Sequence, residues 1–140
     1  MKFVKKPASL TLLVSILIFV VTELIRLPNE GVIREFRRYY NGSFIEPLEI
    51  VAVTLLGVSI WLAFFTLTVQ KKWWRIARWF IGIAALILTF SLLIPYQGGG
   101  FISFPGVREL IILWALVFGL FTVGLTLVSR KSSTKDTLPT

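Results

Sequence analysis

The sequence contains no cysteine and no histidine among its 140 residues. Without cysteine the chain can form no disulfide, thiol redox centre or thiolate metal site. Without histidine it offers no imidazole ligand for haem, zinc or copper and no Ser–His catalytic pair. Charged residues are scarce as well, at 16% of the chain, where soluble domains have about a quarter. The sequence therefore predicts no metal site, no cofactor and no enzymatic activity.

Apolar residues make up 56% of the chain, and the mean hydropathy is +0.82. A soluble protein of this size could not bury so much apolar surface, because its surface-to-volume ratio is too high. A helix needs about 20 apolar residues to cross a membrane. The runs are continuously apolar rather than alternating, which favours helices over the strands of a barrel. The predicted transmembrane spans are residues 8–27, 47–70, 76–95 and 107–129.

The fold class that follows is an all-α integral membrane protein, with residues 1–140 forming one four-transmembrane-helix bundle that ends in a polar tail at 130–140. The first apolar run begins with lysines, as signal peptides do. It is long for a signal peptide, however, and no small-residue cleavage site follows it. We expect this run to be retained as a span.

Basic residues predict how the spans are oriented. Ten of the 15 lysines and arginines fall in the N-terminal segment, the loop between spans two and three, and the C-terminal tail. All six glutamates lie in segments on the opposite side. Because cytoplasmic loops are enriched in Lys and Arg, we expect a multi-pass protein with both termini cytoplasmic. The same bias predicts anionic lipid headgroups as inner-side partners and accounts for the net charge of +8 without nucleic acid.

A short amphipathic helix is predicted at residues 29–40, in the outer loop between the first two spans. Its apolar residues recur at helical spacing: Val32, Ile33, Phe36, Tyr39 and Tyr40. Such a helix is too short to span the membrane but can lie on its surface; the alternative is a solvated loop. Asn41-Gly42 predicts the end of the helix. With Ser43 it also matches a glycosylation acceptor, and both interpretations stay open.

The segment at residues 71–79 is predicted to be an inner loop that anchors the chain at the membrane surface. Indole rings favour the headgroup level, and lysine and arginine reach the lipid phosphates. Basic residues interleaved with aromatics also occur in nucleic-acid sites, but beside a membrane span the anchor is favoured. The predicted anchors are Trp73, Trp74, Trp79, Lys71, Lys72 and Arg75.

Ionisable residues inside membrane spans usually mark function, and here none lies at the centre of a span. Those near the predicted outer ends are Glu23, Arg26, Glu49, Arg108 and Glu109. The favoured interpretation is structural pairing: Glu23 and Arg26 are three residues apart on one helix, and Glu49 and Glu109 are expected to find Arg26 or Arg108 on a neighbouring helix. The alternative is an outer vestibule of carboxylates that attracts a cation or relays protons.

Small and polar residues predict how the helices meet. Ser59 with Ala63, and Ala115 with Gly119, form pairs of small residues that allow close helix approach. Serine and threonine hydroxyls within the spans are expected to bond to carbonyls of their own helices. The uncharged, glycine-rich segment at 95–106 is expected to form an outer hairpin, with a re-entrant segment as the alternative.

Three functions remain open from the sequence. The absence of a catalytic set favours a non-catalytic accessory or scaffold subunit of a larger membrane assembly, bound to protein partners or to copies of itself. Glu23 in the first span and the four-span layout resemble small multidrug-type exporters, which implies an oligomeric transporter or channel. The acidic start of span two, at Glu46 and Glu49, and Phe64-Phe65-Thr66 near its end resemble the layout of DoxX-type families, which implies a membrane enzyme or redox-partner subunit. Both resemblances are architectural.

Overall fold

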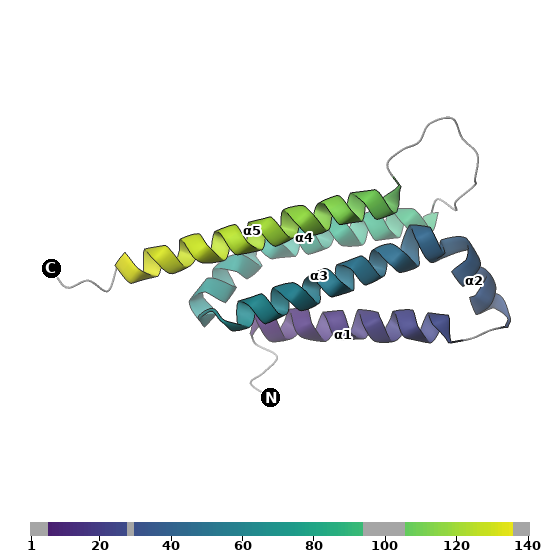
Figure 1. Cartoon of the computed structure of the whole chain (residues 1–140), viewed down its shortest axis with the longest axis horizontal. Helices are drawn as coiled ribbons and strands as arrows, with labels where there is room; N and C mark the ends of the chain where they lie inside the picture. The colour runs from purple at the N-terminus through teal and green to yellow at the C-terminus, as the bar shows by residue number, and fades with distance from the viewer. Residues whose placement is uncertain (1–5, 28–29, 94–105, 136–140) are drawn as a thin grey trace.

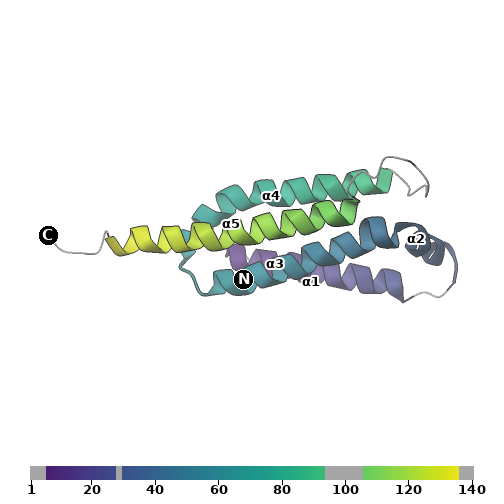
Figure 2. The same cartoon turned by 45° about the horizontal axis from the view of Figure 1, so that its top comes forward.

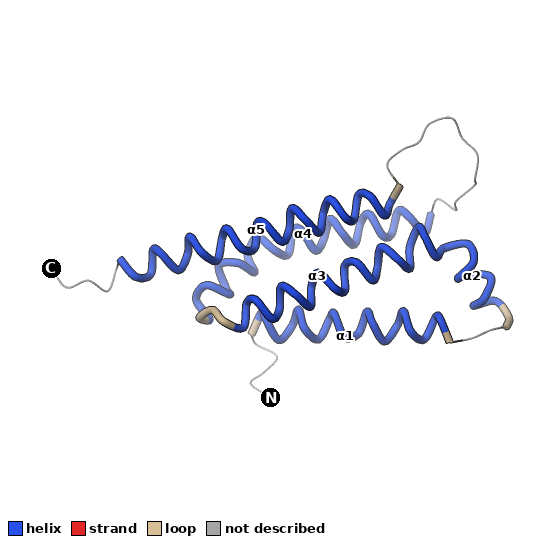
Figure 3. The backbone as a smooth tube through the Cα atoms, in the orientation of Figure 1, coloured by secondary structure: helices blue, strands red, loops and turns tan. Residues whose placement is uncertain are grey.

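The computed structural model describes residues 6–27, 30–93 and 106–135, and these ranges are almost entirely helical (Figures 1 and 3). The elements are α1 (Pro7–Arg26), α2 (Val32–Tyr40), the π-helical turn η2 (Asn41–Ile45), α3 (Glu46–Ala63), α4 (Leu67–Leu93) and α5 (Val107–Lys135). Four of them, α1, α3, α4 and α5, are long and apolar enough to cross a membrane. The four predicted spans are therefore confirmed as long apolar helices. The segment at 95–105 and the last residues of the tail lie outside the described ranges.

The long helices run alternately up and down. Helix α1 packs against α3, α3 against α5, and α5 against α4, whereas α1 and α4 contact each other only sparsely. Figure 2 shows the resulting order α4, α5, α3, α1 across the bundle. One end of the bundle, called the α2 end here, holds the end of α1, the start of α3 and the start of α5 (Figure 1). The opposite end, called the turn end, holds the start of α1 and the connection from α3 to α4.

Helix α2 ends at Tyr40 as predicted, but it starts later than predicted and the helical backbone does not stop after it. It begins at Val32 rather than at residue 29, because Gly31 precedes it with φ +83°, a conformation that glycine adopts without steric cost. Asn41-Gly42 does not stop the helical backbone: the chain continues through η2 directly into α3. Phe36 packs on Tyr40, with ring centroids 4.6 Å apart, and on Phe44 at 6.4 Å. Phe36, which the sequence places on the membrane-facing side of this helix, therefore packs against other side chains of the protein.

The connection between α3 and α4 lies earlier in the sequence than predicted. Helix α3 ends at Ala63, not at residue 70, and α4 begins at Leu67, nine residues before the predicted span three. Gln70 stabilises this turn: its Nε2 donates to the carbonyls of Leu62 and Phe65, each at 3.0 Å, and its Oε1 accepts from the backbone N–H of Ala8 at 3.5 Å. The predicted inner loop at 71–79 is therefore wrong, since these residues are helical.

Aromatic rings fill the contact between α4 and α5. Trp73 and Phe118 are fully buried, and Phe118 lies 5.1 Å from Trp114 and 5.4 Å from Phe80 between ring centroids. Each buried indole N–H finds an acceptor on the facing helix: Trp73 donates to Thr122 Oγ1 at 3.0 Å and Trp114 donates to the carbonyl of Phe80 at 2.8 Å. Aromatic side chains therefore fill this contact, and both indole N–H groups have hydrogen-bond acceptors, as the interior of a membrane protein requires.

Hydroxyl groups behave largely as the sequence predicts. Thr89 and Ser91 donate to carbonyls one turn earlier in α4. Thr126 does the same in α5 and also accepts from the indole N–H of Trp61 in α3 at 3.0 Å. Ser15 is an exception, because its Oγ donates across to the carbonyl of Ala52 in α3 at 2.8 Å. These bonds fix the depth of α1 and α5 relative to α3.

Candidate functional site

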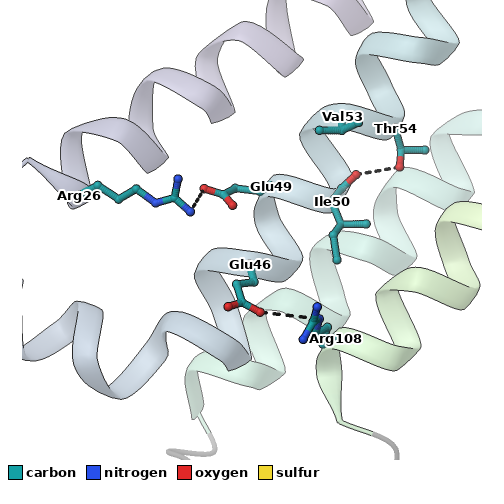
Figure 4. Close-up of a pocket in the computed structure, with 7 residues that line it drawn as sticks. All are labelled: Arg26, Glu46, Glu49, Ile50, Val53, Thr54 and Arg108. Atoms are coloured by element: carbon teal, nitrogen blue, oxygen red, sulfur yellow. Dashed lines mark hydrogen bonds and ion pairs between the residues drawn. The ribbon is translucent and has the colours of Figure 1, made fainter.

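An open pocket of about 520 Å³ lies at the α2 end, where the ends of α1, α3 and α5 meet (Figure 4). Four of the residues that line it are charged, and they are called the charge cluster here: Arg26, Glu46, Glu49 and Arg108. Ile50, Val53 and Thr54 of α3 form the apolar side of the pocket, since the Thr54 hydroxyl is turned to its own helix and donates to the carbonyl of Ile50 at 2.7 Å. The pocket therefore combines charges of both signs with an apolar wall.

Arg26 connects α1 to α3 within this pocket. Its Nη2 lies 2.5 Å from Oε1 of Glu49, and its Nη1 lies 3.6 Å from Oε1 of Glu23 on the same helix. Glu49 is the more buried of the two acids, with 24% of its side chain exposed against 62% for Glu23. The predicted pairing of Glu23 with Arg26, and of Glu49 with an arginine on another helix, is confirmed.

Arg108 connects α5 to α3, but through a residue that the predicted site did not include. Its Nε lies 3.7 Å from Oε2 of Glu46, whose Oε1 accepts from the Asn41 side chain at 3.1 Å. Glu46 is three residues before Glu49, so both acids share the first turn of α3. The sequence shows that spacing, but which of the two acids faces α5 depends on how the helices pack.

Helix termini favour this arrangement electrostatically. Glu46 and Glu49 lie at the N-terminus of α3 and Arg26 in the last turn of α1, where the helix macrodipoles stabilise charges of these signs by about 0.3–1 kcal/mol at exposed positions. Arg37 of α2 adds a bond from its Nη1 to the carbonyl of Arg26 at 2.5 Å. Helix α2 is thereby attached to the same end of α1 that supplies the charge cluster.

Glu109 does not join the charge cluster. Its carboxylate folds back over Gly106, close enough that a Cβ on that residue would collide with it. Among the ion pairs of the described residues, none includes Glu109. The prediction that it pairs with Arg26 or Arg108 across a helix contact is therefore wrong. The carboxylate stays at the N-terminus of its own helix, where the macrodipole favours it.

The predicted anchors separate into two groups. Trp73 is fully buried, in contact with Trp74 and Phe118, so its side chain packs against protein rather than lipid. Trp74 is half-buried, whereas the remaining four are exposed on α4: Trp79, Lys71, Lys72 and Arg75. Helix α4 has 27 residues, about 40 Å of helix against about 30 Å of hydrocarbon. The excess of about 10 Å leaves room for its basic first turns at a membrane surface.

The charge cluster contains two arginines and two glutamates, and its acids are not arranged like a metal site. No group of three or more metal-binding side chains occurs within residues 6–27, 30–93 and 106–135. Glu46 and Glu49 each face an arginine, which leaves them as partners in ion pairs. Comparison with protein-family models, with curated proteins and with solved structures finds no match for this chain.

Proposed function

We propose that the protein is a non-catalytic accessory or scaffold subunit of a larger membrane assembly. The observation that carries this proposal is the incomplete packing of α1. Its span is the least buried of the four, at 17% against 22% for α4, 28% for α5 and 39% for α3, and it packs mainly on α3. Its outward face is a continuous apolar strip that includes Leu13, Leu17, Val20 and Leu24, each about half exposed. This strip is the surface that we assign to a partner helix.

The charge cluster supports a structural role for the ionisable residues. Arg26 and Arg108 pair with acids of α3 from the helices on either side of it, so each ion pair joins two helices. The α4–α5 contact is filled by Trp73, Trp114 and Phe118, which leaves no aqueous path between those two helices at this depth. Both features are those of a packed subunit rather than of a pore-forming monomer.

Replacing Leu17 with tryptophan is expected to abolish partner binding without unfolding the bundle. The side chain is 55% exposed, so the larger ring clashes with a docked helix but not with the chain's own core. The measurement is recovery of stoichiometric partners after purification in mild detergent, followed by mass determination. Leu120→Trp is the matched control, since Leu120 is 75% exposed on α5. Recovery of a lone monomer from the native protein, or equal loss of partners in both variants, contradicts the proposal.

We also propose that both termini are cytoplasmic, from the charge distribution of the sequence. The chain lacks cysteine, so single cysteines can be labelled without background. Val32 is 82% exposed at the α2 end, so Val32→Cys should react with an impermeant maleimide in intact cells. Lys72→Cys, near the turn end, should react only after permeabilisation. The reverse pattern overturns the orientation.

A second candidate, a small oligomeric transporter, is favoured by one observation: Glu46 and Glu49 line a pocket that is open to the surface. In the accessory role, Glu49→Gln should lower the free energy of unfolding by about 1 kcal/mol, the upper end for partly exposed ion pairs, and leave partner binding intact. Melting temperature and proteoliposome flux are measured together, with the exposed Glu30→Gln as control. Flux by the native protein alone that disappears in Glu49→Gln at unchanged melting temperature favours the transporter.

A further inference from the structure

The face of α3 that points away from the bundle carries a row of exposed apolar side chains, which is interrupted at Gly57. Val53, Gly57, Ile60 and Phe64 are spaced by four, three and four residues, so they lie on one side of the helix. Their side chains are exposed, with 58% for Val53, 56% for Ile60 and 82% for Phe64. Gly57 leaves open space in the middle, since a Cβ there would contact nothing within 4 Å.

This row has a hollow at each end. At the α2 end is the pocket of the charge cluster, which includes Val53. At the turn end is an apolar cavity of about 270 Å³ between α1 and α3, lined by Ala8, Ser9, Leu12, Ser59, Ile60, Ala63 and Phe64. The small residues Ser59 and Ala63 thus line a cavity instead of closing the helix contact. The two hollows and the row between them are called the α3 trough here.

At the charged end of the trough, Arg108 and Glu49 each have polar atoms that no described residue binds. Arg108 is 59% exposed, and its ion pair with Glu46 runs from Nε at 3.7 Å; no hydrogen bond from its two terminal nitrogens is seen among the described residues. Glu49 uses Oε1 for Arg26, and its Oε2 has no bond to any described residue. Guanidinium nitrogens and a carboxylate oxygen that have no partner within the described ranges therefore line one pocket.

We propose that the α3 trough binds a phospholipid with a phosphoethanolamine headgroup. The phosphate accepts from the guanidinium of Arg108, and the primary ammonium donates to Glu49, so the pocket takes a headgroup that carries one charge of each sign. From Glu49 to Ile60 is about 16 Å of helix, close to half of the hydrocarbon thickness of about 30 Å. An acyl chain that starts at the charge cluster therefore passes over Gly57 and reaches the apolar cavity within one leaflet.

The proposed specificity follows from hydrogen bonding. A choline headgroup has no N–H to donate to Glu49, and a glycerol headgroup has no cation to pair with it. Losing a hydrogen bond to a charged group reduces binding about tenfold. We therefore expect phosphatidylethanolamine to be retained about tenfold better than phosphatidylcholine or phosphatidylglycerol. This inference does not depend on the accessory role, because the partner strip of Leu13, Leu17, Val20 and Leu24 shares no residue with the lining of the two hollows.

Native mass spectrometry of the whole chain, released from detergent containing each of these three lipids in turn, tests the proposal. Arg108→Gln should reduce phosphatidylethanolamine occupancy about tenfold. Gly57→Leu should also reduce phosphatidylethanolamine occupancy, because the leucine side chain fills the gap at residue 57. Misfolding would not explain this loss of binding, because leucine is a better helix former than glycine. Arg78→Gln, an exposed arginine of α4 outside the trough, should change nothing.

Each outcome decides for or against the trough. Selective retention of phosphatidylethanolamine that is lost in both trough variants and kept in Arg78→Gln supports it. Equal retention of the three lipids overturns it, as does an equal loss in Arg78→Gln and Arg108→Gln. Undiminished binding by a folded Gly57→Leu protein also overturns it, because the acyl chain then lies elsewhere.

Discussion

Replacing Phe118 with alanine is expected to lower the free energy of unfolding by about 3 kcal/mol. Phe118 is fully buried, and its ring lies 5.1 Å from Trp114, 5.4 Å from Phe80 and 6.0 Å from Trp73. Removing the ring leaves a cavity among three aromatic side chains that are fixed by other contacts. The value is at the low end for a buried phenylalanine, because in a lipid-embedded bundle packing, rather than removal from water, supplies most of the loss.

The matched control is Phe90→Ala, the same chemical change on the outward face of α4, where the ring is 60% exposed. It should change the free energy of unfolding by no more than about 0.5 kcal/mol. Thermal unfolding in mild detergent, followed by circular dichroism and by tryptophan emission, gives both values. Tryptophan emission of the folded protein should also change for Phe118→Ala, since the ring contacts two indoles. If the two variants have the same melting temperature, the α4–α5 contact is not the core of the bundle.

The indole hydrogen bonds can be separated from ring packing at the same contact. Trp73 is fully buried and donates to Thr122 Oγ1 at 3.0 Å. Thr122 is itself in a helix, so its hydroxyl can serve as the acceptor only while it lies opposite the indole. The bond therefore helps to fix the axial position of α4 against α5.

The sequence predicts the long helices well, because length and hydropathy alone determine whether a segment can cross a membrane. It also predicts the pairing of Arg26 with Glu23, since both lie on one helix and the spacing is local. The contact between Glu46 and Arg108 depends on the rotation of α3 relative to α5, which no local pattern encodes. Trp73 illustrates the same limit. Its position beside lysines is typical of an interface anchor, yet its side of the helix faces α5.

The sequence does not predict the turn between α3 and α4, for a different reason. Residues 64–66 contain no glycine or proline, and the apolar run continues through them, so the usual stop signals are absent. The free carbonyls at the end of α3 are satisfied instead by a side chain that comes later in the sequence: Gln70 lies eight residues after Leu62. A polar residue at the end of a long apolar run was the only local signal of this turn.

Gln70→Glu is expected to be the most destabilising single-atom change at the turn end. Gln70 is 5% exposed, and its amide nitrogen donates to the carbonyls of Leu62 and Phe65. A carboxylate keeps the size and the acceptor for the Ala8 N–H, but it places negative oxygen against two carbonyls that lose their donor. Leaving buried polar groups unsatisfied costs about 1–3 kcal/mol, and the buried charge adds to this loss.

Gln70→Met separates the hydrogen bonds from the charge, because methionine has a similar length and no donor. We expect the free energy of unfolding to fall in the order native, Gln70→Met, Gln70→Glu, measured by thermal unfolding in the same detergent. Lowering the pH should restore part of the loss in Gln70→Glu only, since a protonated carboxyl is neutral and regains one O–H to donate to Leu62 or Phe65. Equal stability of all three proteins would show that the turn forms without the Gln70 bonds, and that α1, α3 and α4 are held together at this end by apolar packing alone.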